Sequence, residues 1–206
     1  MSSGRGPGGR APRLLVGSAN PGKVREYREI LSGLDLEVVA PADLDPVPPE
    51  PAEDAASFAE NATSKARAYA VASGLQTIAD DSGLEVFALR DAPGVRSRRY
   101  FGEDATPEER NERLLALLEG VQDRAARFVC VTALASPDGH VELFDGEVHG
   151  EIAEAPRGDG GFGYDPVFVI AGDGRTMAEL TAEEKHRVSH RGLAGAKLRA
   201  RLAGGG

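Results

Sequence analysis

Ile78-Ala79-Asp80-Asp81-Ser82-Gly83-Leu84-Glu85-Val86 is the stretch that decides the fold prediction for this chain. Two carboxylates, a hydroxyl and a glycine lie between two short apolar runs that predict strands, the second over residues 84–89. We therefore expect an acidic turn at the end of a buried strand. Carboxylates there are costly unless a cation or hydrogen-bond donors meet them. A magnesium ion carrying a phosphorylated substrate would meet them, but a plain polar turn explains these residues equally well.

The composition is that of an ordinary globular protein with an excess of acidic residues. The 206 residues predict a single domain over 13–203 that follows a Gly-, Arg- and Pro-rich tail at 1–12, expected to be disordered. A net charge of −9 argues against a nucleic-acid partner. No apolar run is long enough to span a bilayer, so we expect a cytoplasmic protein with no membrane partner. The single cysteine, Cys130, lies in an apolar run and is expected to be a buried structural thiol.

An anion-binding loop is predicted near the start of the domain. Residues 14–16 predict a buried strand, residues 18–23 form a loop of small residues that ends in a lysine, and Val24, Tyr27 and Ile30 recur at helical spacing. Free N–H groups at a helix start, together with a lysine, bind phosphate well. An ordinary strand-to-helix turn explains the same residues. The polar residues expected on the opposite face of this helix are Lys23, Arg25, Glu26, Arg28 and Glu29.

Several further elements follow from periodicity and from turn residues. A helix is predicted from about Ala55 to Ser73, with Gly74 as its stop. Its Asn61 and Lys65 belong either to a solvent face or to a site. A capping box at Thr106 predicts another helix that runs to Gly120. The remaining predicted strands are 126–135 paired with 140–150, and 167–170. A basic cluster, which either clamps phosphates or pairs with surface carboxylates, consists of Arg96, Arg98 and Arg99.

Two stretches near the C-terminal end predict contacts to a planar, polar ligand. Residues 158–166 place four glycines around two aromatic residues, which allows close backbone approach and stacking on a ring. A flexible hairpin loop is the simpler interpretation. Ser189 is the predicted N-cap of the last helix, which would put His190 and Arg191 in an exposed first turn.

Six sequence blocks occur in a fixed order along the chain. They are SANPGK (18–23), SFAENATSKA (57–66), ADDSGLEV (79–86), PGVRSRRYFGEDAT (93–106), GGFGYDPVF (160–168) and AELTAEEKHRVSHRG (178–192). Each block alone is a weak motif, but six in the same order are specific. Through these blocks the chain resembles, from about Arg13 to Leu202, the inosine triphosphate pyrophosphatase family, the XTP/dITP diphosphatases that act on non-standard purine nucleotides.

The resemblance implies a fold and an activity. The implied fold is α/β, with a long twisted mixed β-sheet flanked by helices and two lobes with the active-site cleft between them. The implied activity is Mg²⁺-dependent cleavage between the α and β phosphates of purine nucleoside triphosphates, namely ITP, dITP and XTP, which gives the monophosphate and pyrophosphate. A homodimer is also implied.

The resemblance also assigns residue roles. Asp81 corresponds to the catalytic base and to a metal ligand, Glu53 to a second metal residue, and Asp80 to a metal ligand or its immediate neighbour. Glu53 lies in a proline-rich loop of uncertain register, where Ala52 or Asp54 could take its place. The implied substrate-binding residues are Ser18, Ala19, Asn20, Pro21, Gly22, Lys23, Ser82, Phe162, Gly163, Tyr164, Asp165, Lys185, His190 and Arg191.

This residue set can discriminate between purines. Donors from His190, Arg191 or the backbone would satisfy a 6-keto oxygen, whereas a 6-amino group would leave them unpaired, a mismatch worth roughly 10⁴-fold in favourable cases. Three positions depart from the family pattern, namely Arg96, Arg98 and His186. Two alternatives remain open: a Maf-like nucleotide pyrophosphatase with another substrate, and a nucleotide sensor without turnover.

Overall fold

The computed structural model describes residues 11–204, so most of the predicted N-terminal tail, 1–10, lies outside the described residues. The strands are β1 (Arg13–Val16), β2 (Glu37–Val39), β3 (Gln76–Val86), β4 (Ala92–Pro93), β5 (Ala125–Ala135), β6 (Val141–Ile152) and β7 (Phe168–Ile170). The α-helices are α1 (Pro21–Ile30), α2 (Phe58–Ser73), α3 (Pro107–Leu117), α4 (Ala182–Val188) and α5 (His190–Gly204). Short 3₁₀ helices are η1 (Pro41–Asp43), η2 (Phe87–Leu89), η3 (Gly94–Arg96), η4 (Asp165–Val167) and η5 (Met177–Glu179). Within the described range, none of the helices has both the length and the apolar character needed to cross a membrane.

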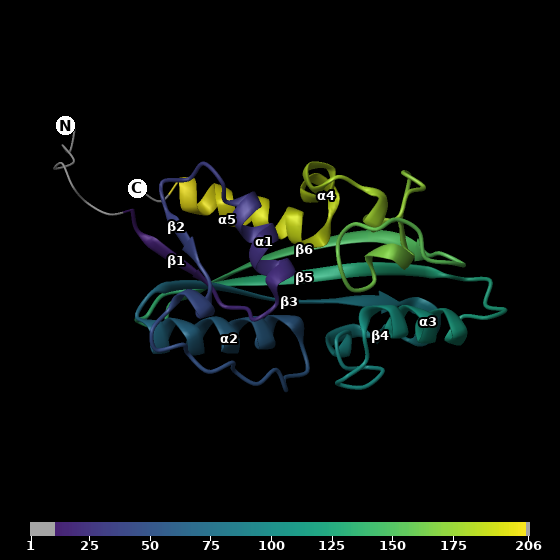
Figure 1. Cartoon of the computed structure of the whole chain (residues 1–206), viewed down its shortest axis with the longest axis horizontal. Coiled ribbons are helices and arrows are strands. Elements are labelled where there is room, and N and C mark those ends of the chain that lie inside the picture. Colours follow the sequence, from purple (N-terminus) through teal and green to yellow (C-terminus); the bar gives the residue numbers. More distant parts are fainter. Residues whose placement is uncertain (1–10, 205–206) are drawn as a thin grey trace.

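One mixed sheet runs through the molecule. Its strand order is β2-β1-β3-β5-β6-β7, with β4 beside β3. The pairs β1–β2 and β1–β3 are parallel, and the other pairs are antiparallel. Three long strands, β3, β5 and β6, form its spine and connect the two ends of the molecule (Figure 1). The predicted long, mixed sheet is confirmed.

The predicted acidic turn is wrong, because β3 continues straight through it. Asp80 and Asp81 lie in the middle of the strand, in register with Thr132 and Val131 of β5. Ten consecutive residues of β3 pair with β5, so the backbone hydrogen bonds of the acidic segment are satisfied within the sheet. The second predicted strand is the end of this same strand, and it stops at Val86, where η2 begins.

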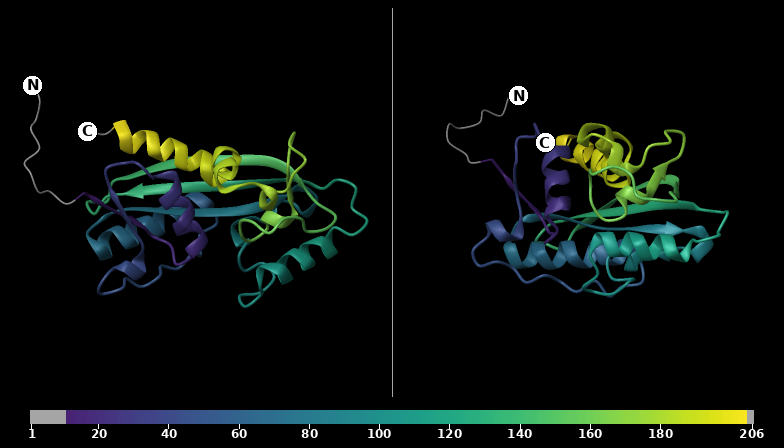
Figure 2. Two further views of the ribbon diagram at one scale, coloured as in Figure 1. Left: turned by 45° about the horizontal axis from the view of Figure 1, so that its top comes forward. Right: turned by 45° about the vertical axis from the view of Figure 1, so that its right-hand side comes forward.

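The helices cover both faces of the sheet. Helices α2 and α3 lie below the long strands in Figure 1, and α1, α4 and α5 lie above them. The elements β1, β2, α1 and α2 gather at one end of these strands, whereas α3, β4 and the segment around β7 gather at the other end (Figure 2). These two groups are the two lobes, and each has its own apolar core. The first core includes Leu14, Tyr27, Ile78 and Leu198, and the second includes Leu84, Leu114, Phe128 and Phe168.

Helix α2 packs tightly on the middle of the sheet. Ala62, Ala66 and Ala70 on one side of the helix meet Ala79 and Ala133 of the strands, and all five are fully or almost fully buried. Small residues on both surfaces allow the backbones to come close, which brings the polar residues of α2 within reach of β3.

The predicted capping residues are found at the helix ends, but α2 starts later than predicted. Gly74 ends α2 in the left-handed conformation, with φ 67°, and Thr106 starts α3 with a capping box. Helix α2 begins at Phe58 and not at Ala55, because the hydroxyl of Ser57 accepts the N–H of Glu60 at 3.2 Å and so makes Ser57 the N-cap. The hydroxyl of Ser189 likewise accepts the N–H of Gly192 at 3.1 Å.

Cys130 is a buried structural thiol, as predicted. Its side chain is fully buried in β5, and burial raises the pKa of the thiol to about 12. The reactive thiolate is therefore scarce at neutral pH.

The last helix rests on β6 at a glycine. A Cβ at Gly146 would lie 2.2 Å from the carbonyl oxygen of His190 and 2.6 Å from the backbone nitrogen of Ala194. Both contacts are with backbone atoms, which cannot rotate away. The first turn of α5 can therefore touch the sheet only because residue 146 has no side chain.

Replacing Gly146 by alanine should lift the start of α5 and lower the free energy of unfolding by about 2 kcal/mol, as overpacking does in a rigid core. Urea unfolding followed by circular dichroism measures this. The control is Gly204→Ala at the end of α5, where an added Cβ meets nothing within 4 Å. Equal stability of the two variants would contradict the close-packing argument.

Candidate active site

A cavity of about 320 Å³ lies between the two lobes, at the middle of β3. This volume lies in the range of small-ligand pockets. The predicted site residues that line it are Ser18, Ala19, Asn20, Pro21, Lys23, Glu53, Asp81, Ser82, Phe162, Gly163, Tyr164, Asp165, His190 and Arg191. Three others, Gly22, Asp80 and Lys185, are buried in the wall of the cavity and do not line it.

The loop between β1 and α1 is organised by its asparagine. The Oδ1 atom of Asn20 accepts the N–H groups of Gly22 at 2.9 Å and Lys23 at 3.4 Å, which caps the helix. Gly22 also leaves room for a neighbour, since a Cβ there would lie 2.8 Å from the ring of Phe162. The loop therefore presents the positive end of α1 to the cavity and contacts the opposite lobe.

The two adjacent aspartates face opposite sides of the sheet, as successive strand residues must. Asp80 points toward α1 and α5, where its Oδ2 lies 3.1 Å from Nζ of Lys23 and 3.1 Å from Nη2 of Arg191. Burial alone would raise the pKa of Asp80, but these two cations outweigh it and hold the pKa well below its usual range. Asp80 is thus a permanent anion that positions two cations.

Asp81 points into the cavity toward α2. Its Oδ2 accepts from Nδ2 of Asn61 at 2.9 Å, and its Oδ1 accepts the N–H of Ser82 at 3.0 Å. Burial raises the pKa of Asp81, although Lys23 and the Asn61 hydrogen bond oppose the rise. A carboxylate with a raised pKa is a stronger base than a free one, and this is the property expected of a catalytic group in a cleft.

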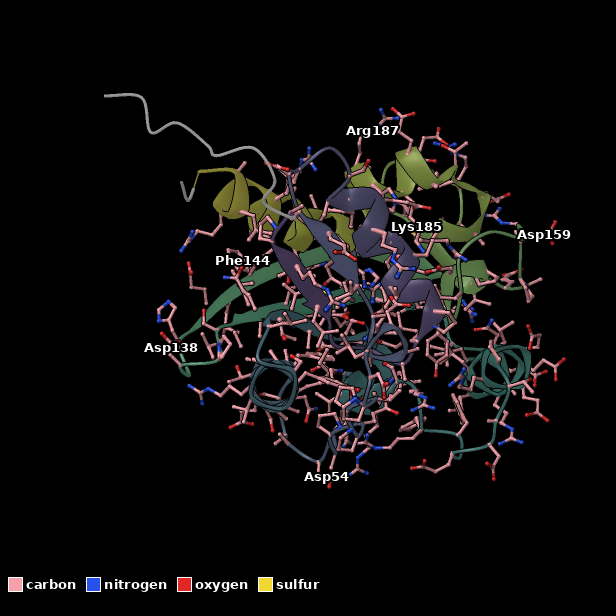
Figure 3. The ribbon with its side chains drawn as sticks, turned by 60° about the vertical axis from the view of Figure 1, so that its left-hand side comes forward. Asp54, Asp138, Phe144, Asp159, Lys185 and Arg187 are labelled. Atoms are coloured by element: carbon pink, nitrogen blue, oxygen red, sulfur yellow. The ribbon has the colours of Figure 1, made fainter. Side chains whose placement is uncertain are left out.

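Glu53 reaches the same cavity from the proline-rich loop. Its carboxylate contacts the ammonium group of Lys65, which is 3% exposed. Nη2 of Arg99 donates to the Glu53 carbonyl oxygen at 2.6 Å, which fixes the loop. The neighbouring Asp54 is exposed and lies at the outer edge of the molecule (Figure 3). Of the two acids at this point in the loop, the structure directs Glu53 and not Asp54 to the cavity.

The prediction that His190 and Arg191 lie in an exposed turn is wrong. They are 4% and 1% exposed, because the first turn of α5 is pressed against β5 and β6. Arg191 donates to Glu26 at 2.8 Å, to Asp80 at 3.1 Å and to the Ser82 hydroxyl at 2.7 Å. Its guanidinium is therefore held in one orientation from several sides.

Lys185 and Glu26 extend this buried network. Lys185 donates to Glu26 at 2.7 Å and to Asp165 at 2.6 Å. It points into the molecule, whereas Arg187 points outward (Figure 3). Placing Glu26 on the solvent face of α1 is wrong, since it is 4% exposed. Burial would raise the pKa of Glu26, but Arg191 and Lys185 lower it to about 2.

The glycine-rich loop is held as a shelf over the cavity. The N–H of Phe162 donates to Oδ2 of Asp165 at 2.8 Å, and the ammonium of Lys185 lies 4.9 Å from the Phe162 ring centre. The hydroxyl of Tyr164 donates to the carbonyl of Ser97 at 2.9 Å, which ties the loop to the η3 segment. These contacts make the loop an ordered element of the site.

His190 offers a free ring nitrogen. Its ring stacks on Phe128 with centres 4.6 Å apart and planes 16° apart, and its buried Nδ1 has no partner in the described part of the chain. Burial and the charge of Arg191 lower the pKa of His190 well below its usual range, so the ring is neutral at pH 7. An unpartnered buried nitrogen beside a cavity is a candidate ligand contact.

Asn61, Lys65 and Glu26 are site residues that the sequence analysis did not assign. Asn61 and Lys65 are one helical turn apart and adjoin Ala62 and Ala66, and this alanine stripe was the available signal for a buried face. Glu26 gave no comparable signal, because its cation partners are more than 150 positions away in sequence.

The basic cluster divides between the cavity and the solvent. Arg98 and Arg99 line the cavity together with Arg110 of α3, whereas Arg96 is exposed and does not.

Among the described residues, no group of three or more His, Cys, Asp or Glu side chains is arranged to hold a metal ion without further ligands.

Comparison with known proteins agrees with this architecture. The model of the Ham1 family matches residues 14–201. The chain belongs to the Ham1 family. Members named dITP/XTP pyrophosphatase include one from Deinococcus deserti, 48% identical over 97% of this chain and 93% of that protein. Another, from Geobacter sulfurreducens, is 50% identical over 92% of this chain and 96% of the relative.

Solved structures of the family share the fold. A HAM1 protein from Coxiella burnetii superimposes with a TM-score of 0.84 at 40% identity, covering 93% of this chain and 98% of that one. A Mycobacterium abscessus structure described as a nucleoside-triphosphatase and dITP/XTP pyrophosphatase gives 0.72 at 44% identity, covering 90% and 98%. The α/β fold that the sequence resemblance implied is therefore confirmed.

Replacing Glu26 by glutamine should lower the free energy of unfolding by about 3 kcal/mol at pH 7, because it leaves buried Lys185 and Arg191 short of one counter-charge. The folded-state pKa of Glu26 is depressed, so its stabilisation is present above its ordinary pKa of 4.5 and is lost as the pH falls toward about 2. Urea titrations between pH 3 and 7 should show the difference from wild type shrinking as the pH falls. The control is Glu29→Gln in the same helix, whose exposed carboxylate contacts His186 at 2.7 Å and which should cost little.

Replacing Asn61 by alanine should raise the pKa of Asp81 further, because it removes a hydrogen bond that favours the charged carboxylate. The side-chain carboxyl carbon of Asp81, followed by NMR during a pH titration, reports this directly. Ser64→Ala, on the exposed side of the same helix, is the control. An unchanged or lowered pKa in the Asn61 variant would show that the hydrogen bond does not set the basicity of Asp81.

Proposed function

We propose that this protein hydrolyses ITP, dITP and XTP between the α and β phosphates and releases the nucleoside monophosphate and pyrophosphate. The observation that carries the proposal is the placement of Asp81, whose pKa is raised by burial, in one cavity with the start of α1 and the ring of Phe162. The names of the Deinococcus and Geobacter relatives support the substrate class. Removal of such nucleotides from the pool is the corresponding cellular role.

Asp81 is the proposed general base. Its carboxylate is held by Asn61 and by the backbone N–H of Ser82, so it has one fixed orientation toward the cavity. It would take a proton from water as that water attacks the α phosphorus. Lys23, at the start of α1, and Lys65, beside Glu53, would donate hydrogen bonds to the phosphate oxygens nearest Asp81.

Magnesium fits this set of donors. Mg²⁺ usually takes one or two carboxylates and obtains its remaining ligands from water and phosphate, and Asp81 and Glu53 are two carboxylates lining one cavity. They would hold the ion, while Asp80 would act beside it by positioning Lys23 and Arg191. Bound Mg²⁺ supplies neutralisation of phosphate charge and polarisation of the phosphoryl oxygens.

The base would lie on the Phe162 shelf. The neutral ring of His190 lines the cavity, and one of its ring nitrogens can carry the proton and donate to a 6-keto oxygen. A 6-amino group would meet that donor with another donor, and the resulting unpaired polar groups disfavour adenine. Lys185 would contribute through the ring of Phe162 and through Asp165, and not by direct contact.

A panel of ITP, XTP, dITP, GTP and ATP with Mg²⁺ tests the proposal. We expect monophosphate and pyrophosphate from the first three, and turnover of ATP lower by about 10²-fold or more. Asp81→Asn should abolish turnover and leave the thermal unfolding temperature unchanged or higher, since it removes a costly buried charge. Release of orthophosphate would exclude α–β cleavage, equal rates on all five would exclude the specificity, and wild-type turnover by the variant would exclude Asp81 as the base.

Homodimer formation and a cytoplasmic location are also part of the proposal; the first rests on the family resemblance and the second on the sequence prediction. Light scattering of the purified chain checks the first, and fractionation of cells checks the second. Absence of any turnover on the panel would favour the nucleotide-sensor alternative.

A further inference from the structure

The charges around the cavity are distributed unevenly between its walls. On the wall formed by α1, β3 and α5, every cation has a buried or half-buried carboxylate partner. Lys23 pairs with Asp80, and Arg191 pairs with both Asp80 and Glu26. Lys65, which reaches the cavity from α2, is paired with Glu53. An anionic ligand therefore meets little net positive charge there.

The wall formed by η3 and α3 is different. Its three arginines, Arg98, Arg99 and Arg110, have no carboxylate within salt-bridge distance in the described range of the chain. Arg99 and Arg110 each donate to a neutral backbone carbonyl, those of Glu53 and Arg98, both at 2.6 Å. These bonds orient the guanidinium groups and leave their charges uncompensated.

Arg98 itself is available to a ligand. Its side chain is exposed and lines the cavity, and within residues 11–204 its guanidinium takes part in none of the hydrogen bonds or ion pairs. Two carboxylates that line the cavity, Asp81 and Glu50, also have no cation within salt-bridge distance among the described residues. Asp81 is one of the two residues proposed to hold a metal ion, and Glu50 can offset only one of three charges, so the wall of three arginines retains an excess of positive charge.

The wall is also held rigidly. The Ser97 hydroxyl donates to the Gly94 carbonyl at 2.7 Å and accepts the N–H of Leu84 at 2.8 Å, which ties the segment to β3. The approach is possible because residue 83 is glycine, since a Cβ there would lie 2.3 Å from the Gly94 carbonyl oxygen. Tyr164 binds the Ser97 carbonyl from the other side. The backbone next to Arg98 is thereby fixed, so that binding of an anion costs conformational entropy of the side chain and little of the backbone.

We propose that Arg98, supported by Arg110, binds the outer phosphates of a triphosphate tail and the pyrophosphate that leaves, and so selects triphosphates over shorter tails. The assignment of the tail to a nucleotide rests on the proposed function. The anion site itself follows from the uncompensated charges of this wall, and it takes a condensed phosphate of two or more units. A guanidinium group can donate two parallel N–H hydrogen bonds to two oxygens of one phosphate.

The first test measures binding without any nucleotide. Calorimetric titration of inorganic tripolyphosphate into the full-length protein should give a dissociation constant about tenfold higher for Arg98→Ala than for wild type, the size expected for one charge-assisted contact. Arg98→Lys should recover part of the loss. The matched control is Arg96→Ala, two positions away and outside the cavity, which removes the same charge and should bind tripolyphosphate almost as wild type does.

The second test measures turnover. With ITP, Arg98→Ala should raise KM about tenfold with kcat within about twofold, and pyrophosphate should inhibit less well by a similar factor. Inhibition by the monophosphate IMP should not change, because it lacks the outer phosphates. An equal loss for ITP and IMP, or an equal loss in Arg96→Ala and Arg98→Ala, would overturn the assignment.

The two tests distinguish an error in the proposed function from an error in the proposed anion site. If the wild-type protein does not hydrolyse ITP, the proposed function is wrong, but the tripolyphosphate titration still decides whether Arg98 forms an anion site. If ITP is hydrolysed and tripolyphosphate binds equally to wild type and Arg98→Ala, the anion site is wrong and the proposed function stands.

Discussion

A chain of alternating buried charges holds the two lobes of this protein in one arrangement. Each cation contacts an anion from another segment, so that the helix start of α1, the middle of β3, the glycine-rich loop and the start of α5 are joined. Loss of one charged side chain from this series would lower the free energy of unfolding, because its partner would stay buried without a counter-charge. In order of contact, the members are Lys23, Asp80, Arg191, Glu26, Lys185 and Asp165.

Asp81 does not belong to this series of charged residues. Strand geometry turns Asp80 to the charged side of the sheet and Asp81 to the cavity side, where it accepts hydrogen bonds from Asn61 and from the backbone N–H of Ser82. One carboxylate is thereby a strong and permanent anion and its neighbour a more basic group, although both are aspartates of one strand. Environment and not residue type separates their roles.

Backbone contacts of glycines set the shape of the cavity. Gly146 lets α5 rest on β6, and Gly83 lets the η3 segment approach β3, so each wall is held where a side chain would keep it away. The wall close to Gly83 carries arginines that have no carboxylate partner in the described part of the chain, whereas the cations of the opposite wall are paired. A phosphate tail that enters the cavity would therefore be directed toward the arginines.

Local pattern was enough to predict the strands at 14–16 and 126–135, the capped helix at Thr106 and the stop at Gly74, because periodicity, caps and turn residues act over a few neighbours. The order of six blocks was enough to predict the family. Tertiary structure alone decided that 78–86 is a continuous strand, since its pairing partner lies about 50 positions away. It also decided that Glu26, Asn61, His190 and Arg191 are buried. Burial of a polar or charged side chain such as Asn61 or Glu26 depends on partners brought together by folding, and in the chain those partners are 20 to 165 residues apart.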